Sequence, residues 1–260
     1  MVLYPGRRTL SALLALGCHI SRFQRFCRFA AMKCRDDKTI SIADHRSKIH
    51  RENFFTILQQ QLKDYELLKI ENLPRFTCGA VGYIGYEMAG QIEKLPKPKR
   101  DVIGSDDALL GFYNQLVAFD HLKNEVILIA NVFIDNDSDV RQLYLEAQNR
   151  LDCLQARLNR SYEGELRFTA DLASEEANFT KRDFMTAVEQ AKEYILAGDI
   201  FQAVISQRFS MAYSDDVFQV YRALRNINPS PYMFFLDFLD YQVIGSSPEP
   251  LIRAQDNELE

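Results

Sequence analysis

A glutamate held between two prolines is the residue of this sequence best mounted to do chemistry. The string GSSPEP, residues 245–250, places Glu249 between Pro248 and Pro250, directly after a run with the composition of a strand. Because a proline ring fixes its own backbone angle, a carboxyl group here is held in a narrow range of positions. Such a group can protonate a leaving group, which accelerates a reaction by roughly 10²–10⁴-fold when burial raises its pKa toward neutrality. The alternative is a turn glutamate that caps the end of the strand.

The remaining chemistry-bearing residue types predict no metal site and no disulfide framework. None of the histidines has metal-ligand spacing, and none of the cysteines forms a CxxC pair (His19, His45, His50 and His121; Cys18, Cys27, Cys34, Cys78 and Cys153). An odd, scattered set of cysteines fits a reducing compartment, and we expect a cytoplasmic protein. The net charge of −5 argues against nucleic-acid binding. No run of 18 apolar residues occurs, so we expect no membrane-spanning helix.

The elements that must position Glu249 fall into two regions, and the first covers residues 30–160. Its patterns predict strand–turn–strand over 30–44, a helix within 52–68, an apolar strand from about 76, a hairpin over 108–134 that turns at 121–124, and a helix over 138–159. Gly79, Gly82 and Gly85 lie in the apolar strand, where glycine usually marks a bulge or a close backbone approach. Their spacing does not fit a phosphate-binding loop.

The second region covers residues 177–260, after a connector at 160–176. Thr180 and Asp183 resemble a capping box, and the helix that they begin should end at Gly198. A strand over 201–211, a helix over 215–226 and strands over 231–238 and 241–246 follow. We therefore predict an α+β fold of layered, largely antiparallel sheets with flanking helices.

The first 29 residues form an atypical basic segment. Seven arginine or lysine residues occur within 1–35, and the first acidic residue is Asp36. This composition imitates an organelle transit peptide. A divergent amino terminus and an incorrectly translated start are the alternatives, and we favour them.

Four ordered motifs resemble a known family: LPRFTCGAVGYIGYE, LAGDIFQAVISQRFS, INPSPYMFFLDF and VIGSSPE. Together they resemble the large subunit of anthranilate synthase and, more broadly, the chorismate-utilising enzymes. The resemblance covers residues 30–260. Because family members are longer, it implies an amino-terminal half with a truncated chorismate-binding domain over 177–260 and a fold that is incomplete relative to the family.

The resemblance implies an activity for the whole protein. Chorismate and ammonia, supplied by a glutamine amidotransferase subunit, would give anthranilate and pyruvate in tryptophan biosynthesis, with Mg²⁺ bound by residues outside this chain. Aminodeoxychorismate synthase and a catalytically inactive, truncated binding module remain alternatives. We expect the isolated 260-residue chain to be inactive.

The resemblance also implies residue roles. Glu249 would be the general acid for loss of the 4-hydroxyl of chorismate. Gln202 would lie at the substrate, where relatives that add water carry a lysine; an uncharged amide cannot act as a base, which favours ammonia as nucleophile. Gln202 could instead be a solvent-facing strand residue. Pro231, Tyr232 and Met233 match the wall of a tryptophan effector pocket, or could be strand core. The family's Leu-Leu-Glu-Ser element, which helps to bind tryptophan, does not occur before Ala31.

Overall fold

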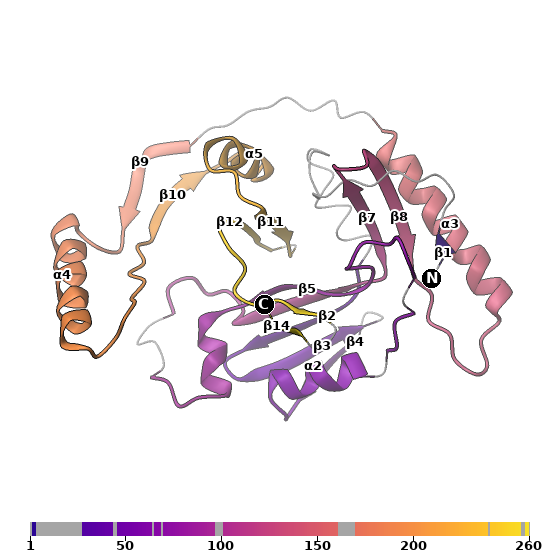
Figure 1. Ribbon diagram of the computed structural model, residues 1–260, viewed down its shortest axis with the longest axis horizontal. Helices are drawn as coiled ribbons and strands as arrows, with labels where there is room; N and C mark the ends of the chain where they lie inside the picture. Colours follow the sequence, from indigo (N-terminus) through magenta and orange to yellow (C-terminus); the bar gives the residue numbers. More distant parts are fainter. Residues whose placement is uncertain are drawn as a thin grey trace. The chain divides into compact units, whose positions relative to one another are not determined.

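The computed structural model describes residues 2–3, 28–43, 46–63, 65–68, 70–96, 101–160, 170–238, 240–255 and 258–259. The chain forms two compact units (Figure 1). Unit 1 comprises residues 1–164 and 236–243, and unit 2 comprises residues 165–235 and 244–260. Antiparallel sheets and helices alternate through both units, which confirms the predicted α+β class. Most of the basic segment 1–29 lies outside the described residues.

The larger sheet of unit 1 has five antiparallel strands in the order β4-β3-β2-β6-β5. Their bounds are β2 Arg28–Arg35, β3 Lys38–Ala43, β4 Arg46–His50, β5 Gly79–Ile84 and β6 Ala108–Tyr113. The predicted first turn is confirmed, since Asp36 and Asp37 join β2 to β3 with φ angles of 50° and 62°. Aspartate tolerates this left-handed backbone better than most residues, and consecutive positive φ angles suit a tight hairpin.

Helix α2, Phe54–Lys63, packs on this sheet and closes the main core (Figure 1). Its first turn is capped by Asn53, whose Oδ1 accepts a hydrogen bond of 2.8 Å from the Thr56 amide. The fully buried members of the core come from β2, α2, β6 and the short helix η1, Tyr86–Gln91: Met32, Cys34, Phe54, Ile57, Met88, Ala108, Leu110 and Phe112. The apolar spacing of Phe55, Leu58, Leu62 and Tyr65 predicts a neighbouring face instead: Phe55 and Leu58 are partly buried against this core, whereas Leu62 and Tyr65 are exposed.

The predicted hairpin over 108–134 contains three strands rather than two. β6 ends at Tyr113 in the five-stranded sheet, whereas β7, Gln115–Asp120, and β8, Glu125–Ala130, belong to a three-stranded sheet of order β1-β8-β7. The break at Asn114 follows from its carbonyl, which accepts the Asn131 amide at 2.7 Å instead of continuing the first ladder. The turn at 121–124 is confirmed. Helix α3, Val140–Leu158, covers β8, and β1 is Val2–Leu3.

Unit 2 differs from the prediction in three places, one of which is a short strand pair at 254–255 and 258–259 that the sequence did not predict. Its elements are β9 Ala170–Ala177, α4 Lys181–Ala197, β10 Phe209–Tyr213, α5 Phe218–Ile227, β11 Tyr232–Asp237, β12 Gln242–Ser247, β13 Ala254–Gln255 and β14 Glu258–Leu259. The connector predicted over 160–176 ends in β9, which pairs with β10. The strand predicted over 201–211 begins only at Phe209, because β9 gives pairing partners to 209–213 alone. The residues from 202 to 208 are mostly exposed and outside any strand.

Helix α4 begins and ends where the sequence predicts. The Thr180 hydroxyl accepts from the Asp183 amide at 3.2 Å and donates to the Asp183 carboxylate at 2.8 Å. Gly198 closes the helix with a φ of 82°, in the left-handed region that favours glycine. No α4 residue is buried. Within the described ranges, no helix is both long enough and apolar enough to cross a bilayer.

Candidate functional site

Glu249 stands just beyond the end of β12, in a turn closed by a serine. The Ser247 hydroxyl donates a hydrogen bond of 2.9 Å to the Glu249 carbonyl and spans Pro248 between them. This is a local side-chain turn of the kind that serine forms in place of a backbone turn. Glu249 itself is exposed. The described residues therefore fix its backbone but leave its carboxyl group open to water.

A second segment, the turn from Asn228 to Pro231 between α5 and β11, is bonded directly to this one. The Ser246 hydroxyl donates to the Asn228 carbonyl at 2.6 Å, and the Ser230 hydroxyl donates to the Ser247 carbonyl. Ser230 also accepts the Tyr232 amide at 3.1 Å. Two of the motifs recognised in the sequence, INPSPY and GSSPE, are therefore tied together by serine hydroxyls.

An aromatic cluster connects α5 to β11, the elements on either side of the turn at 228–231. Phe218 and Tyr221 of α5 are 2% exposed, so the first turn of that helix is firmly buried. The Phe235 ring of β11 meets both rings edge to face, with centroids 5.3 Å and 5.9 Å away. Gly245 lies under the Phe234 ring, so close that a Cβ atom there would lie 2.2 Å from Cζ. The Phe234 ring therefore leaves no room for a side chain at Gly245, which explains the glycine before the two serines of the motif.

Of the predicted effector residues, Pro231 directly precedes β11, and Tyr232 and Met233 are its first two residues. Pro231 and Tyr232 are exposed, and Met233 is half-buried. The Tyr232 amide is engaged by Ser230, whereas its side chain faces outward with 38% of its surface exposed. Pro231 and Tyr232 are therefore open to solvent beside Ser230, which is bonded to the segment that carries Glu249.

Gln202 is exposed and follows α4 in irregular backbone rather than in the predicted strand. The strand pairing of this stretch begins at Phe209, opposite Ala177, and just before it the side-chain Oδ1 of Asn178 accepts the Arg208 amide at 2.6 Å. Among the described residues, no hydrogen bond joins Gln202 to Glu249 or to the turn at 228–231. The structure does not by itself bring the two predicted site residues together.

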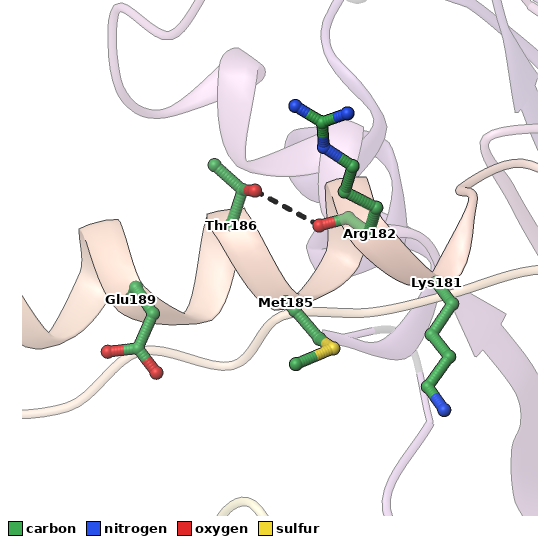
Figure 2. A pocket seen from close by; sticks show the side chains of 5 residues that line it. All are labelled: Lys181, Arg182, Met185, Thr186 and Glu189. Atoms are coloured by element: carbon green, nitrogen blue, oxygen red, sulfur yellow. Dashed lines mark hydrogen bonds between the residues drawn. The ribbon is translucent and has the colours of Figure 1, made fainter.

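A shallow hollow of about 570 Å³ runs along α4, lined by Lys181, Arg182, Met185, Thr186 and Glu189. Figure 2 shows Lys181, Met185 and Glu189 extending from one side of the helix and Arg182 and Thr186 from the other. The Thr186 hydroxyl is bonded to the Arg182 carbonyl at 3.0 Å. Polar groups that diverge in this way do not converge on one ligand, and none belongs to the predicted site.

Sequence reasoning missed the three serines that connect the two segments. The motifs contain Ser230, Ser246 and Ser247 without indicating a role for them, yet each hydroxyl donates a hydrogen bond to a backbone carbonyl of the site. The available signal was serine next to proline in both NPSP and GSSP, because serine beside proline commonly closes a turn with its hydroxyl. Which carbonyl each hydroxyl reaches depends on tertiary packing, and no spacing rule gives it.

Comparison with protein-family models assigns nearly the whole chain to one family. The profile of the chorismate binding enzyme family matches residues 21–260. Anthranilate synthase component 1 from Acetivibrio thermocellus is 35% identical over 234 residues, which are 86% of this chain and 47% of that protein. The chloroplastic anthranilate synthase alpha subunit 2 of Arabidopsis thaliana is 33% identical, over 85% of this chain and 38% of that protein.

The structural comparison gives the same family. The crystal structure of anthranilate synthase component I from Streptococcus pneumoniae matches 88% of this chain with a TM-score of 0.72 and 27% sequence identity. The match covers 50% of that chain. This chain therefore spans about half the length, or less, of the relatives that it matches.

Proposed function

The chain belongs to the chorismate-binding enzyme family, and we propose that it forms the amino-terminal part of an anthranilate synthase large subunit. The whole protein would convert chorismate and ammonia to anthranilate and pyruvate. A glutamine amidotransferase subunit would supply the ammonia. The observation that carries this proposal is the alignment to anthranilate synthase component 1 over 86% of the chain, together with the serine bonds between its two motif segments.

Glu249 is the proposed proton donor of the reaction. Hydroxide is a poor leaving group, so loss of the 4-hydroxyl of chorismate needs a proton delivered to that oxygen. The Ser247 hydroxyl and the ring of Pro248 fix the backbone that carries the Glu249 carboxyl group. A general acid must also be shielded from bulk water, and in the proposal substrate and the rest of the whole protein provide the cover that the described residues lack.

Gln202 is proposed as a substrate contact. Its amide can donate and accept hydrogen bonds but cannot take a proton from water at neutral pH. Ammonia needs no such activation, so an amide at this position suits amination rather than hydration. Its exposed place after α4 leaves it free to meet substrate once further chain covers this surface.

The proposed magnesium requirement is inferred from family membership alone. The described part of the chain holds no group of three or more histidine, cysteine or acidic side chains arranged to bind a metal ion. These residues do not fit a magnesium site, so no step assigned here to Glu249 or Gln202 depends on one. Magnesium ligands are expected elsewhere in the whole protein.

The proposal also covers regulation and location. Pro231, Tyr232 and Met233 are proposed as part of a tryptophan effector pocket. An apolar wall next to backbone polar groups suits an indole amino acid, which has an apolar ring and a polar backbone end. The protein is proposed to act in the cytoplasm. The domain limits 1–29, 30–160 and 177–260 are likewise retained as proposals, beside the two units of the structure.

A chimaera tests the proposed function without assuming where the natural protein ends. Residues 30–260 replace the aligned part of the Acetivibrio thermocellus component 1, and the product is assayed with chorismate, magnesium and ammonium for anthranilate fluorescence. We expect turnover from the chimaera and none from the 260-residue chain alone. Glu249→Gln keeps the size of the side chain and removes its proton, so we expect kcat to fall by roughly 10²–10⁴-fold.

The matched control is Glu258→Gln, another exposed glutamate a few residues away in β14. It should leave kcat unchanged. A folded chimaera without turnover, or one in which Glu249→Gln behaves like Glu258→Gln, would contradict the proposed role of this half of the chain.

A further inference from the structure

The bonds between the two motif segments form a continuous path to Glu249. The Tyr232 amide donates to the Ser230 hydroxyl, which donates to the Ser247 carbonyl. Ser247 in turn donates its own hydroxyl to the Glu249 carbonyl. A hydroxyl can accept one hydrogen bond and donate another, as Ser230 does here, so all three bonds exist together. Ser246 adds a parallel bond of 2.6 Å to the Asn228 carbonyl.

The backbone between Ser247 and Glu249 has a proline at its centre. Pro248 has no amide hydrogen and cannot donate to a neighbouring strand, and its ring fixes φ but not ψ. The Ser247 hydroxyl spans that free angle by bonding across the proline to the Glu249 carbonyl. Glu249 therefore keeps its place relative to Ser247, and Ser247 keeps its place relative to the turn through Ser230.

We propose that Ser230 and Ser247 are positioning residues for Glu249, with Ser230 setting where the end of β12 lies against the turn at 228–231. This proposal rests on the proposed function for its catalytic meaning. The consequence is that Glu249 is held from the same turn that begins the proposed effector segment. The turn and the carboxyl group should therefore move together rather than independently.

The alternative is that Ser230 only stabilises unit 2. Ser174 of β9 offers a matched control, because its hydroxyl has the same double role. It donates to the Asp171 carbonyl at 2.7 Å and accepts the Ala212 amide at 2.8 Å. Both serines lie in unit 2, and each bridges backbone groups from two segments. Replacing either by alanine removes one hydroxyl with two hydrogen bonds, but only Ser230 is connected to Glu249.

Hydrogen–deuterium exchange on the 260-residue chain tests the connection without any catalysis. Loss of a hydrogen bond worth about 1 kcal/mol should speed exchange about fivefold, so Ser230→Ala should do so in peptides covering 228–233 and 244–249. Ser174→Ala should act on β9 and β10 and leave 244–249 unchanged. The proposal is overturned if Ser230→Ala leaves 244–249 at the native rate, or if Ser174→Ala raises that rate equally.

The chimaera supplies the catalytic readout. Ser230→Ala and Ser247→Ala should each lower kcat by roughly tenfold to a hundredfold while KM for chorismate changes little, because a misplaced acid loses rate rather than binding. Ser230→Thr, which keeps the hydroxyl, should restore most of the rate. Full kcat in Ser230→Ala, in a chimaera that requires Glu249, overturns the positioning role.

Failure of the proposed function has a different signature. In that case the native chimaera is inactive, or Glu249→Gln has no effect, whatever the serine variants do. The exchange measurement still decides whether Ser230 holds the segment that carries Glu249.

Discussion

The hydroxyl oxygens of Tyr83 and Tyr241 lie 2.5 Å apart, although 158 residues separate them in the chain. Tyr83 donates its own proton to the Asp106 carbonyl at 2.7 Å, so Tyr241 is the donor of the bond between the two hydroxyls. Phe238 is 5% exposed and packs edge to face on the Tyr83 ring, with centroids 5.6 Å apart. The segment 236–243, between the motifs of β11 and β12, is anchored in this way within unit 1.

Removing the Tyr241 hydroxyl should destabilise unit 1. Tyr241→Phe takes away one donor while the Tyr83 hydroxyl keeps its bond to Asp106, so we expect a loss of about 0.5–1.5 kcal/mol in free energy of unfolding. Urea unfolding followed by tyrosine fluorescence measures this, since the chain has no tryptophan. Tyr144→Phe is the control, because that hydroxyl accepts a hydrogen bond from Gln148 at an exposed position on α3. Equal losses in both variants would contradict a specific anchor.

The same contact predicts a loss of stability in alkali. Burial raises the pKa of Tyr83 well above its ordinary value of 10, and the nearby negative charge of Asp106 raises it further. Above pH 10 the unfolded chain therefore releases this proton before the folded chain does, and stability falls as pH rises. Tyr83→Phe should be less stable than the native chain at pH 7 but should show a shallower fall above pH 10. Parallel pH profiles of the two proteins would contradict this assignment.

Local signals in the sequence predicted much of the fold. Thr180 and Gly198 fixed both ends of α4, and the glycines around Gly82 indicated the close approach of β5 to its neighbour. Each of these predictions depends on a conformational preference of one or two residues. The structure confirms both predictions, because the tertiary contacts at these residues are compatible with their local conformational preferences.

What the sequence did not predict depends on pairing between distant segments. β9 has a polar, acidic composition without strand periodicity, and it is a strand because β10 pairs with it. Gln202 was placed in a strand by its apolar neighbours, yet no described strand pairs with that stretch. The candidate site shows the same limit. Its motif residues are recognisable in the sequence, but the bond from Ser230 to Ser247 depends on a tertiary contact between two turns, which local sequence does not predict.

Asp107 should limit stability at neutral pH. Burial raises the pKa of its carboxyl group, the Asp36 amide that it accepts at 3.0 Å partly offsets this, and the carboxylates of Asp36, Glu87 and Asp37 raise it further. Ionisation therefore costs the folded state free energy as pH rises above the ordinary value of 3.8. Asp107→Asn keeps an acceptor for the Asp36 amide and removes the charge.

We expect this variant to gain of the order of 0.5 kcal/mol at pH 7, the size typical of partly exposed charge interactions, and to lose the gain below pH 3.8. Urea unfolding at the two pH values measures the difference. Asp152→Asn, on the exposed side of α3, is the control and should show no comparable gain. A gain that persists unchanged in acid would mean that charge is not its cause.

The close approach at Gly82 predicts the most damaging small substitution in unit 1. A Cβ atom at Gly82 would lie 1.9 Å from the Leu109 carbonyl oxygen, a backbone atom in the adjacent strand that cannot turn aside. Gly82→Ala must therefore push β5 away from β6, which should cost about 1–3 kcal/mol in free energy of unfolding. Gly90→Ala in η1 is the matched control, because a Cβ atom there has no heavy atom within 4 Å. Urea unfolding of the two variants measures the difference, and similar losses would show that β5 and β6 are not in such close contact.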